Sequence, residues 1–290
     1  MTTTTDHGTS FFLHFKKPGF PAIMLTLGLI FLYLPIFILV LYSFNASRLV
    51  TVWAGFSTKW YAELFQDEQL MGAVWTSLRI AFYNASMAVI LGTVSAFALD
   101  RFGKFSGRTI FNSMLTAPLV MPDVIIGLSL LLLFVTMADL IGWPMERGML
   151  TIWIAHVTVS TAYVAVVISA RLREVDHSIE EAAMDLGATP LRTFFLITIP
   201  TIASSLTTGW LLAFTLSLDD LVIASFVSGP GSTTLPMVVF SSVRLGISPK
   251  INAIATLIIL VVSLTTLSGW WFMFRSERER RANLERFGDN

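Results

Sequence analysis

The sequence contains no cysteine, which excludes disulfide bonds and metal sites built on cysteine. Its four histidines are scattered without the spacing of metal ligands, so we expect no metal site. The Gly-x-x-x-x-Gly-Lys-Ser/Thr pattern of the P-loop is absent, and the chain is therefore not expected to bind ATP through such a loop. Nothing in the sequence indicates a cofactor or a nucleic-acid partner.

Charge is also scarce. Charged residues make up 13% of the 290 residues, whereas soluble proteins carry roughly 25%, and apolar residues make up 54%. The mean hydropathy of +0.73 agrees with a protein embedded in lipid. A helix needs about 20 predominantly apolar residues to cross a bilayer. The apolar runs predict an all-α integral membrane protein with six transmembrane helices, at about 20–44, 73–99, 110–136, 149–170, 200–226 and 251–274.

The basic residues predict the orientation of these spans. If the N-terminus is cytoplasmic, 13 of the 19 basic residues fall on the cytoplasmic side, 5 on the opposite side and 1 inside the second span. We therefore expect a cytoplasmic tail at 1–19, a transmembrane domain at 20–274 and a second cytoplasmic tail at 275–290. The first apolar run is longer than the core of a secretory signal, so we interpret it as an uncleaved span. The polar segment 176–200 then lies in the cytoplasm, between the fourth and fifth spans.

Within that segment, the beginning of a helix is marked by acidic and hydroxyl side chains. Ser178 and Glu181 have the Ser-x-x-Glu spacing of a capping box, in which each side chain accepts a hydrogen bond from the other residue's backbone. Glu180 and Glu181 also place negative charge where the helix dipole is positive. The pattern predicts a short helix that begins near Ser178.

A corner and a second helix follow. Gly187 suits the left-handed conformation that ends a helix, and Thr189 followed by Pro190 suits the N-cap and first turn of the next one. A rigid helix–corner–helix between two spans is suited to transmitting force. The alternative is an ordinary interfacial loop that happens to be helical.

Three acidic residues lie inside the predicted spans, where a carboxylate is costly and is usually functional or paired: Asp123, Asp219 and Asp220. At ~1.5 Å per residue, Asp123 lies roughly 20 Å above the cytoplasmic end of its span, and Asp220 lies roughly 30 Å above the end of its own. Together these acids would form a lining that favours a cation. Neighbouring residues on a helix point about 100° apart, so Asp219 and Asp220 cannot share one direction, and one of them is left for a structural role.

Each acid also has a structural alternative. Arg79 lies at a depth comparable to that of Asp219 and Asp220, and an ion pair with one of them would replace a substrate contact. Asp123 has no basic residue at its depth, so it is our first candidate for contact with a cationic substrate. Its alternatives are protonation, or hydrogen bonds from backbone groups freed by the two prolines of its span.

Two other polar residues lie deep in the fourth span. Tyr163 is a candidate for lining a path, with core packing as the competing role. We expect His156 to be a hydrogen-bonded core residue rather than a proton relay. No Ser–His–Asp arrangement is expected within the spans, and an intramembrane enzyme is therefore not supported.

The cytoplasmic segment also carries a long spaced motif. Glu181-Ala-Ala-x3-Gly187, nine residues, Ile197-x-Ile199-Pro200 resembles the EAA loop of binding-protein-dependent ABC importer permeases, with Ile199 in place of leucine as the single departure. Several longer stretches, among them TAPLVMPDVIIGLSLLLLF and AFTLSLDDLVIASFVSGPGSTTLPM, are similar to the putrescine-transport permeases of bacterial polyamine ABC importers. The likeness covers most of the chain except its first ten residues and its C-terminal tail.

The resemblance implies a six-span type I importer permease in the bacterial inner membrane. Its partners would be a second homologous permease, two copies of a cytoplasmic ATPase, a periplasmic polyamine-binding protein and the surrounding lipid. The chain itself would not be an enzyme. Coupling to the ATPase would fall to six residues of the loop, Glu181, Ala182, Ala183, Asp185, Gly187 and Pro190.

Two other classes of function remain open at this point. An ion-coupled secondary transporter of a cationic substrate would use the same intramembrane acids for protons or sodium. A non-transporting scaffold or receptor subunit would use them only for packing. The substrate-path residues under the transport hypotheses are Asp123, Asp219, Asp220 and Tyr163.

Overall fold

A computed structural model describes residues 19–49, 52–245, 249–264, 267 and 271. The regular elements in this part of the chain are all helices, and the only β-type pairing there is an isolated bridge between Asn45 and Phe56. The chain divides into two compact units, one formed by 1–64 with 247–290 and the other by 65–246. Each unit is described separately.

The first unit contains α1 (Phe20–Ser43), most of α2 (Lys59–Phe65) and a helix at Pro249–Leu264. No residue in the most apolar 18-residue stretch of α1 is buried by the described part of the chain, which suits a helix whose neighbours are lipid or another protein. The loop after α1 folds around Asn45, whose backbone oxygen accepts a hydrogen bond from Trp60 Nε1 at 2.7 Å. The predicted tails at 1–19 and 275–290 lie outside the described residues except for Gly19.

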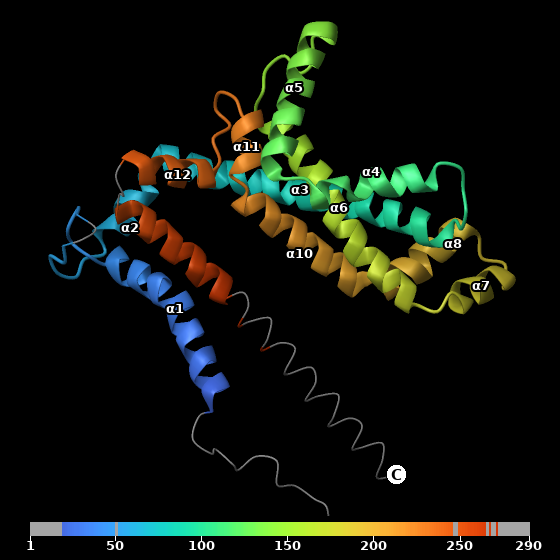
Figure 1. The fold of residues 1–290 in the computed structure, drawn as a ribbon, viewed down its shortest axis with the longest axis horizontal. Helices are drawn as coiled ribbons and strands as arrows, with labels where there is room; N and C mark the ends of the chain where they lie inside the picture. The colour runs from blue at the N-terminus through green and yellow to red at the C-terminus, as the bar shows by residue number, and fades with distance from the viewer. Residues whose placement is uncertain (1–18, 50–51, 246–248, 265–266, 268–270, 272–290) are drawn as a thin grey trace, which may run out of the picture. The chain divides into compact units, whose positions relative to one another are not determined.

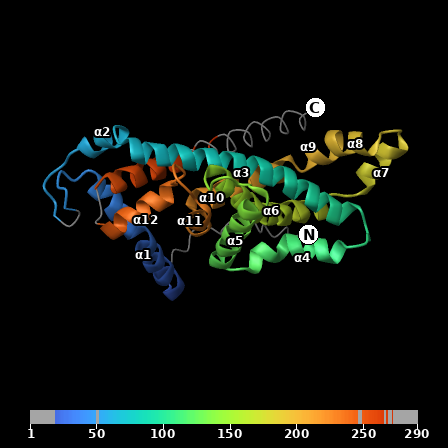
Figure 2. The ribbon, with the colours of Figure 1, turned by 90° about the horizontal axis from the view of Figure 1, so that it is seen from above.

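The second unit is built on three helices that lie side by side (Figures 1 and 2): α3 (Glu68–Arg101), α6 (Met149–Glu174) and α10 (Ala203–Asp219). Small residues allow the close approach. A Cβ atom added to Gly92 of α3 would lie 2.7 Å from Val164 Cγ1 of α6. At the centre, the buried amide Nδ2 of Asn84 donates to Ser160 Oγ at 3.0 Å and to the Ala213 oxygen at 2.8 Å, and so joins all three helices.

The predicted span at 110–136 is divided into two helices. The chain forms α4 (Arg108–Val120), breaks at Met121 and Pro122, and continues as α5 (Asp123–Ile141), which runs in a different direction (Figure 1). Pro122 lacks a backbone N–H, and proline pushes the preceding residue out of the helical region. Met121 accordingly has an extended backbone, with ψ of 137°. The break makes Asp123 the first residue of a helix rather than a mid-helix residue.

The predicted span at 200–226 is also divided. α10 ends at Asp219, and α11 (Val222–Val227) follows an extended Asp220. α12 (Leu235–Leu245) completes the unit.

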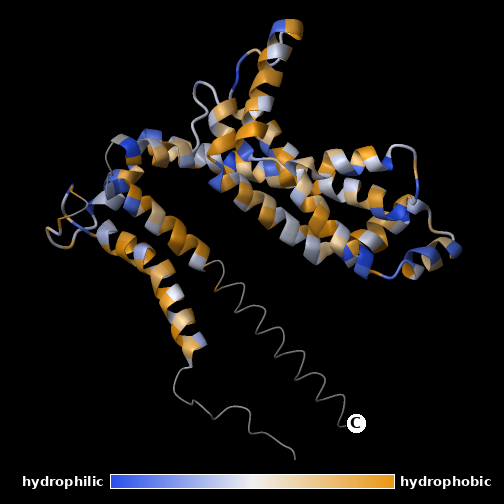
Figure 3. Ribbon diagram, in the orientation of Figure 1, coloured by the Kyte–Doolittle hydropathy of each residue, from blue (hydrophilic) through white to orange (hydrophobic). Residues whose placement is uncertain are grey.

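Among the described residues, four helices are long and apolar enough to cross a membrane, or five if the pair Pro190–Thr201 and Ala203–Asp219, bent by 72°, is one span. Figure 3 shows the apolar colouring of α1 and α5. The sixth predicted span, 251–274, lies partly outside the described residues.

Candidate functional site

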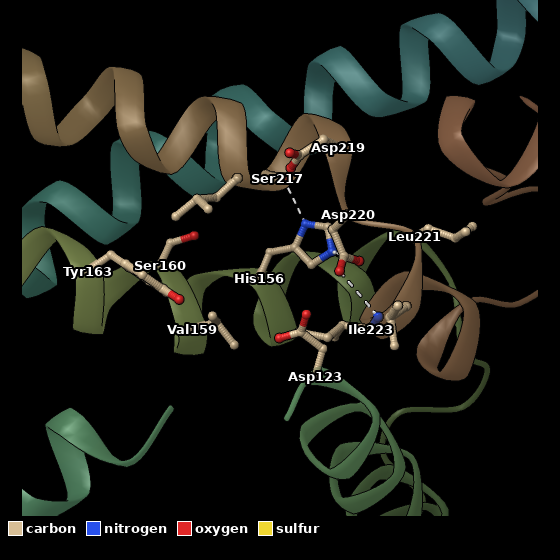
Figure 4. Close-up of a pocket in the computed structure, with 12 residues that line it drawn as sticks. Asp123, His156, Val159, Ser160, Tyr163, Ser217, Asp219, Asp220, Leu221 and Ile223 are labelled. Atoms are coloured by element: carbon tan, nitrogen blue, oxygen red, sulfur yellow. Dashed lines mark hydrogen bonds and ion pairs between the residues drawn. The ribbon is translucent and has the colours of Figure 1, made fainter. Parts of the chain in front are cut away.

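An open cavity of about 310 Å³ lies where the start of α5, the middle of α6 and the α10–α11 break meet (Figure 4). All four substrate-path residues expected from the sequence line it: Asp123, Tyr163, Asp219 and Asp220. They come from three separate helical segments. The structure therefore brings together acids that the sequence places almost a hundred residues apart.

His156 links two of these segments. Its Nδ1 atom lies 2.7 Å from Ser217 Oγ, and its Nε2 atom lies 3.1 Å from Asp220 Oδ2. A neutral imidazole with its proton on Nε2 satisfies both contacts, since the Ser217 hydroxyl then donates to Nδ1 and Nε2–H donates to the carboxylate. His156 is buried, so the expectation of a hydrogen-bonded core histidine is confirmed.

The expectation that the spans hold no Ser–His–Asp set is wrong, because helix packing assembles Ser217, His156 and Asp220 from distant positions. Ser217 is nevertheless buried, with 6% of its surface exposed. A nucleophile has to reach its substrate, so this set has the geometry of a structural link between α6 and α10 rather than of a catalytic triad.

Asp220 has a further structural task. Its Oδ1 atom accepts a hydrogen bond from the Ile223 backbone N–H at 3.3 Å, and its Oδ2 atom accepts one from Ala224 N–H at 2.7 Å. These are backbone donors of the first turn of α11, which no helical carbonyl can satisfy. Asp220 is therefore occupied by the protein itself, in agreement with the expectation that one of the two adjacent acids is structural.

Asp123 and Asp219 differ from Asp220 in this respect. Both are exposed in the chain, and within the described residues neither makes an ion pair. The Asp123 carboxylate also accepts none of the hydrogen bonds found in that part of the chain, and Figure 4 shows it pointing from α5 toward the α6 face that carries His156. The alternative in which freed backbone groups hold Asp123 is therefore not supported.

The proposed pairing of Arg79 with an intramembrane acid is wrong for the described part of the chain. The Arg79 guanidinium lies over the Trp75 ring, with its Cζ atom 4.8 Å from the ring centroid. A cation over an aromatic face is stabilised by the electrons of the ring. Neither Asp219 nor Asp220 has Arg79 as an ion-pair partner there.

The α6 face of the cavity was only partly anticipated from the sequence. His156, Ser160 and Tyr163 are spaced i, i+4 and i+7, which places them on one side of a helix. This periodic set of polar residues in an apolar helix could have predicted that this side of α6 lines a polar cavity. Ser217 carried no such signal, since nothing local distinguishes it from other serines in spans.

The chemistry of the cavity favours an organic cation. Two exposed carboxylates accept hydrogen bonds and carry negative charge, whereas an ammonium group is a pure donor. No group of three His, Cys, Asp or Glu side chains suited to a metal ion is found among the residues that the structure covers.

The second candidate region is the polar segment between α6 and α10. Helix α7 (Ser178–Asp185) begins here, but the expected capping box is not formed. Ser178 is the first helical residue rather than the cap, and its N–H donates to Asp176 Oδ1 at 3.0 Å. Hydrogen bonds from the Ser178 amide and hydroxyl lower the pKa of Asp176 below its ordinary value. The Glu181 carboxylate instead pairs with His177 Nδ1 at 3.1 Å.

The corner after α7 has the predicted conformation. Gly187 has φ of +92°, and the Ala188 N–H donates to the Ala183 oxygen at 3.0 Å, which closes the helix end. Thr189 Oγ1 then accepts from Arg192 N–H at 3.4 Å, and Pro190 occupies the first turn of α8 (Pro190–Thr193). The chain continues through the π-helical turn η1 (Phe194–Thr198) and α9 (Ile199–Thr201) to α10.

Most of the loop residues assigned to coupling lie at the surface. Glu181, Ala182 and Asp185 are exposed on α7, Ala183 is half-buried, and Gly187 and Pro190 are exposed at the corner. An exposed short helix with alanines at its centre leaves room for close approach by another protein.

The chain is similar to known transport proteins over most of its length. The chain is 64% identical, over 264 residues, to the putrescine transport system permease protein PotI of Escherichia coli (strain K12), which covers 91% of this chain and 94% of that protein. It is 39% identical over 234 residues to the spermidine/putrescine transport system permease protein PotC of the same strain, covering 81% and 86%.

The fold is shared with a solved bacterial ABC transporter that imports the acidic polysaccharide alginate. That match has a TM-score of 0.69 at 18% identity and covers 87% of this chain and 95% of the other. Residues 88–281 match the family described as binding-protein-dependent transport system inner membrane component. Given this match and the 64% identity to a permease, the chain belongs to the family of binding-protein-dependent transport system inner membrane components.

Proposed function

We propose that this chain is a permease subunit of an ATP-driven importer of polyamines, with putrescine as its principal substrate. The observation that carries the proposal is the cavity of about 310 Å³ in a chain 64% identical to a putrescine permease. Asp123 and Asp219 are exposed there, and neither has an ion-pair partner among the described residues. The family to which the chain belongs consists of inner-membrane components, and the relatives reported above are permease proteins rather than ATPases.

The substrate's chemistry complements the cavity. Each primary amine of a diamine has a pKa near that of lysine, about 10.4, so putrescine carries two ammonium groups at neutral pH. Asp123 from α5 and Asp219 from the end of α10 offer one carboxylate to each ammonium group. Tyr163 and Ser160 add hydroxyl groups that accept hydrogen bonds from the same donors.

The translocation path is shared with other subunits in this proposal. A second homologous permease closes the open side of the cavity, a periplasmic binding protein delivers the polyamine, and two copies of a cytoplasmic ATPase supply the energy. The chain crosses the membrane six times, with both termini and the α7–α8 corner in the cytoplasm. Lipid and the partner permease cover the most apolar stretch of α1, in which no residue is buried by the described part of this chain.

Energy reaches the path through the α7–α8 corner. The exposed face of α7 docks into a groove of the ATPase, and closure of the ATPase moves this helix as a rigid body. The contacts fall on Glu181, Ala182, Ala183, Asp185, Gly187 and Pro190. The permease then alternates between outward and inward access.

The test is uptake of labelled putrescine and spermidine by the complete assembly in lipid vesicles, with the binding protein outside and ATP inside. We expect saturable putrescine uptake that stops without ATP and persists after ion gradients are collapsed. Uptake that continues without ATP and disappears with the ion gradient would replace this proposal with an ion-coupled transporter. The absence of any polyamine uptake from an assembly that hydrolyses ATP would also overturn it.

A further inference from the structure

We infer that the buried Arg101–Glu180 ion pair, together with Thr198, fixes the coupling helix α7 to the transmembrane helices and is required to pass the ATPase's motion to the substrate path. The inference rests on the proposed function and assigns positioning roles to residues outside the six coupling residues. Glu180 directly precedes Glu181, yet the two side chains have opposite environments. Glu180 is buried, whereas Glu181 is exposed.

The ion pair joins four segments of the chain. Arg101 Nε, at the end of α3, lies 2.9 Å from Glu180 Oε2 on α7, and the two side chains are 9% and 6% exposed. The guanidinium also donates through Nη2 to the backbone oxygen of Leu172, near the end of α6, at 3.1 Å. The other carboxylate oxygen, Oε1, accepts a hydrogen bond from Thr198 Oγ1 at 2.9 Å. Thr198 ends the π-helical turn that leads into α10.

Other ionic contacts of α7 do not make this connection. His177, which directly precedes α7, lies 3.1 Å from Glu181 and 3.9 Å from Glu180, so its contacts stay within one turn. Among the described residues, Glu180 is thus the α7 side chain whose ion pair reaches a long membrane helix. A neighbouring pair, Arg173 Nε to Asp100 Oδ1 at 3.0 Å, fastens α6 to α3 beside it.

Burial makes this link stiff. Two charges that are shielded from water attract each other more strongly than exposed charges, and loss of one partner leaves the other buried and uncompensated. The position also matters, since Thr198 precedes the 72° bend between Pro190–Thr201 and α10. A displacement of α7 is therefore delivered to the base of α10, the helix that carries Asp219 into the cavity.

The first test compares Glu180→Gln with Glu174→Gln in the reconstituted assembly. The control has the same chemistry and a matched ion pair, since Glu174 Oε2 lies 2.9 Å from Arg171 Nη1, but its side chain is 66% exposed. We expect Glu180→Gln to reduce the putrescine taken up per ATP hydrolysed by about tenfold, because an unpaired buried Arg101 loosens the joint. Glu174→Gln should match the wild type.

A second measurement does not depend on the substrate. The chain has no cysteine, so spin labels can be placed on Ile179→Cys in α7 and Ile90→Cys in α3, both exposed positions. In the assembled wild-type complex we expect one narrow distance distribution. Glu180→Gln should broaden this distribution. The double variant Arg101→Gln with Glu180→Gln leaves no unpaired buried charge, so it should narrow the distribution again in part and recover part of the coupling ratio, the putrescine taken up per ATP hydrolysed.

Two results would overturn the inference. One is a wild-type coupling ratio with an unbroadened distribution in Glu180→Gln. The other is a loss of assembled complex alone, with normal coupling in the complexes that remain, which would make the ion pair a folding element only. If the wild-type assembly transports no polyamine, the proposed function fails, and the distance distributions still decide whether Glu180 holds α7 in place.

Discussion

His156 Nε2 lies 3.1 Å from Asp220 Oδ2, and this contact divides the three intramembrane acids into two kinds. The Asp220 carboxylate already accepts hydrogen bonds from two backbone N–H groups and lies within hydrogen-bond distance of the imidazole. Asp123 and Asp219 line the same cavity, and neither makes an ion pair with the described residues. The acid that supports the site and the acids that can bind a substrate are therefore distinguishable by substitution.

Replacing Asp123 with asparagine should weaken transport while leaving the fold intact. A hydrogen bond to a charged group contributes about 1.5–3 kcal/mol, so we expect uptake at low putrescine concentration to fall roughly tenfold or more. Asp139→Asn is the control, since it removes an exposed acid from the other end of α5, away from this cavity. Equal uptake by Asp123→Asn and the control would exclude Asp123 from the path.

Asp220→Ala should behave differently from Asp123→Asn. It removes the cap of α11 and leaves the buried His156 without an acceptor, which should cost about 1–3 kcal/mol of stability. Thermal unfolding of the purified permease in detergent is the measurement. In a double-mutant cycle with His156→Ala, the two effects should fall short of additive by about 0.5 kcal/mol or more. Strict additivity would mean that the contact contributes nothing.

The backbone at Gly187 has a left-handed conformation. At φ of +92°, a β-branched side chain is strained by about 1–3 kcal/mol, so Gly187→Val should distort the corner. We expect ATP hydrolysis to persist while putrescine uptake per ATP falls. Gly187→Asn should retain most coupling, since asparagine tolerates this region. Gly72→Ala is the control, because Gly72 lies inside α3 with open space around it. Wild-type uptake by Gly187→Val would refute the coupling role.

The α3–α6 crossing depends on the absence of a side chain at Gly92. An alanine Cβ there would meet Val164 Cγ1 at 2.7 Å and the Ala165 backbone nitrogen at 3.1 Å. Overpacking of this kind costs about 1–3 kcal/mol, so Gly92→Ala should lower the unfolding temperature of the permease. Adding Val164→Ala should recover part of the loss by removing the Cγ1 contact, while the Val164 Cβ atom at 2.9 Å stays in place. An unfolding temperature equal to that of the wild type would show that the helices separate at little cost.

Local patterns predicted the local geometry well. The left-handed Gly187, the Thr189 cap and the first-turn Pro190 follow from backbone preferences of single residues, and all three are present. The capping box failed because another local acceptor, Asp176, lies close to the Ser178 amide. Sequence spacing alone does not decide which of two nearby acceptors a donor takes.

The span boundaries show the limit of reasoning from hydropathy. Residues 110–136 form one apolar run, yet the helix breaks at Met121 and Pro122. Hydropathy does not predict this break, because it does not register that proline lacks a backbone N–H. The break places Asp123 at the mouth of a cavity. The sequence predicted Asp123 as a candidate substrate contact, but it did not predict its position at the start of a helix.

The sequence by itself determined the class of protein, the scarcity of charge in its apolar runs and the conformation of the corner at Gly187. These properties depend on composition and on neighbours within a few residues. Only the tertiary structure decided that Asp220 is held by the protein, since His156 and Asp220 meet through the packing of α6 against α10. It likewise decided that Glu180 is paired with Arg101 and Glu181 is exposed. The packing of helices decides which partner a buried charged side chain contacts. The local sequence around Glu180 and Glu181 does not indicate which of the two is buried.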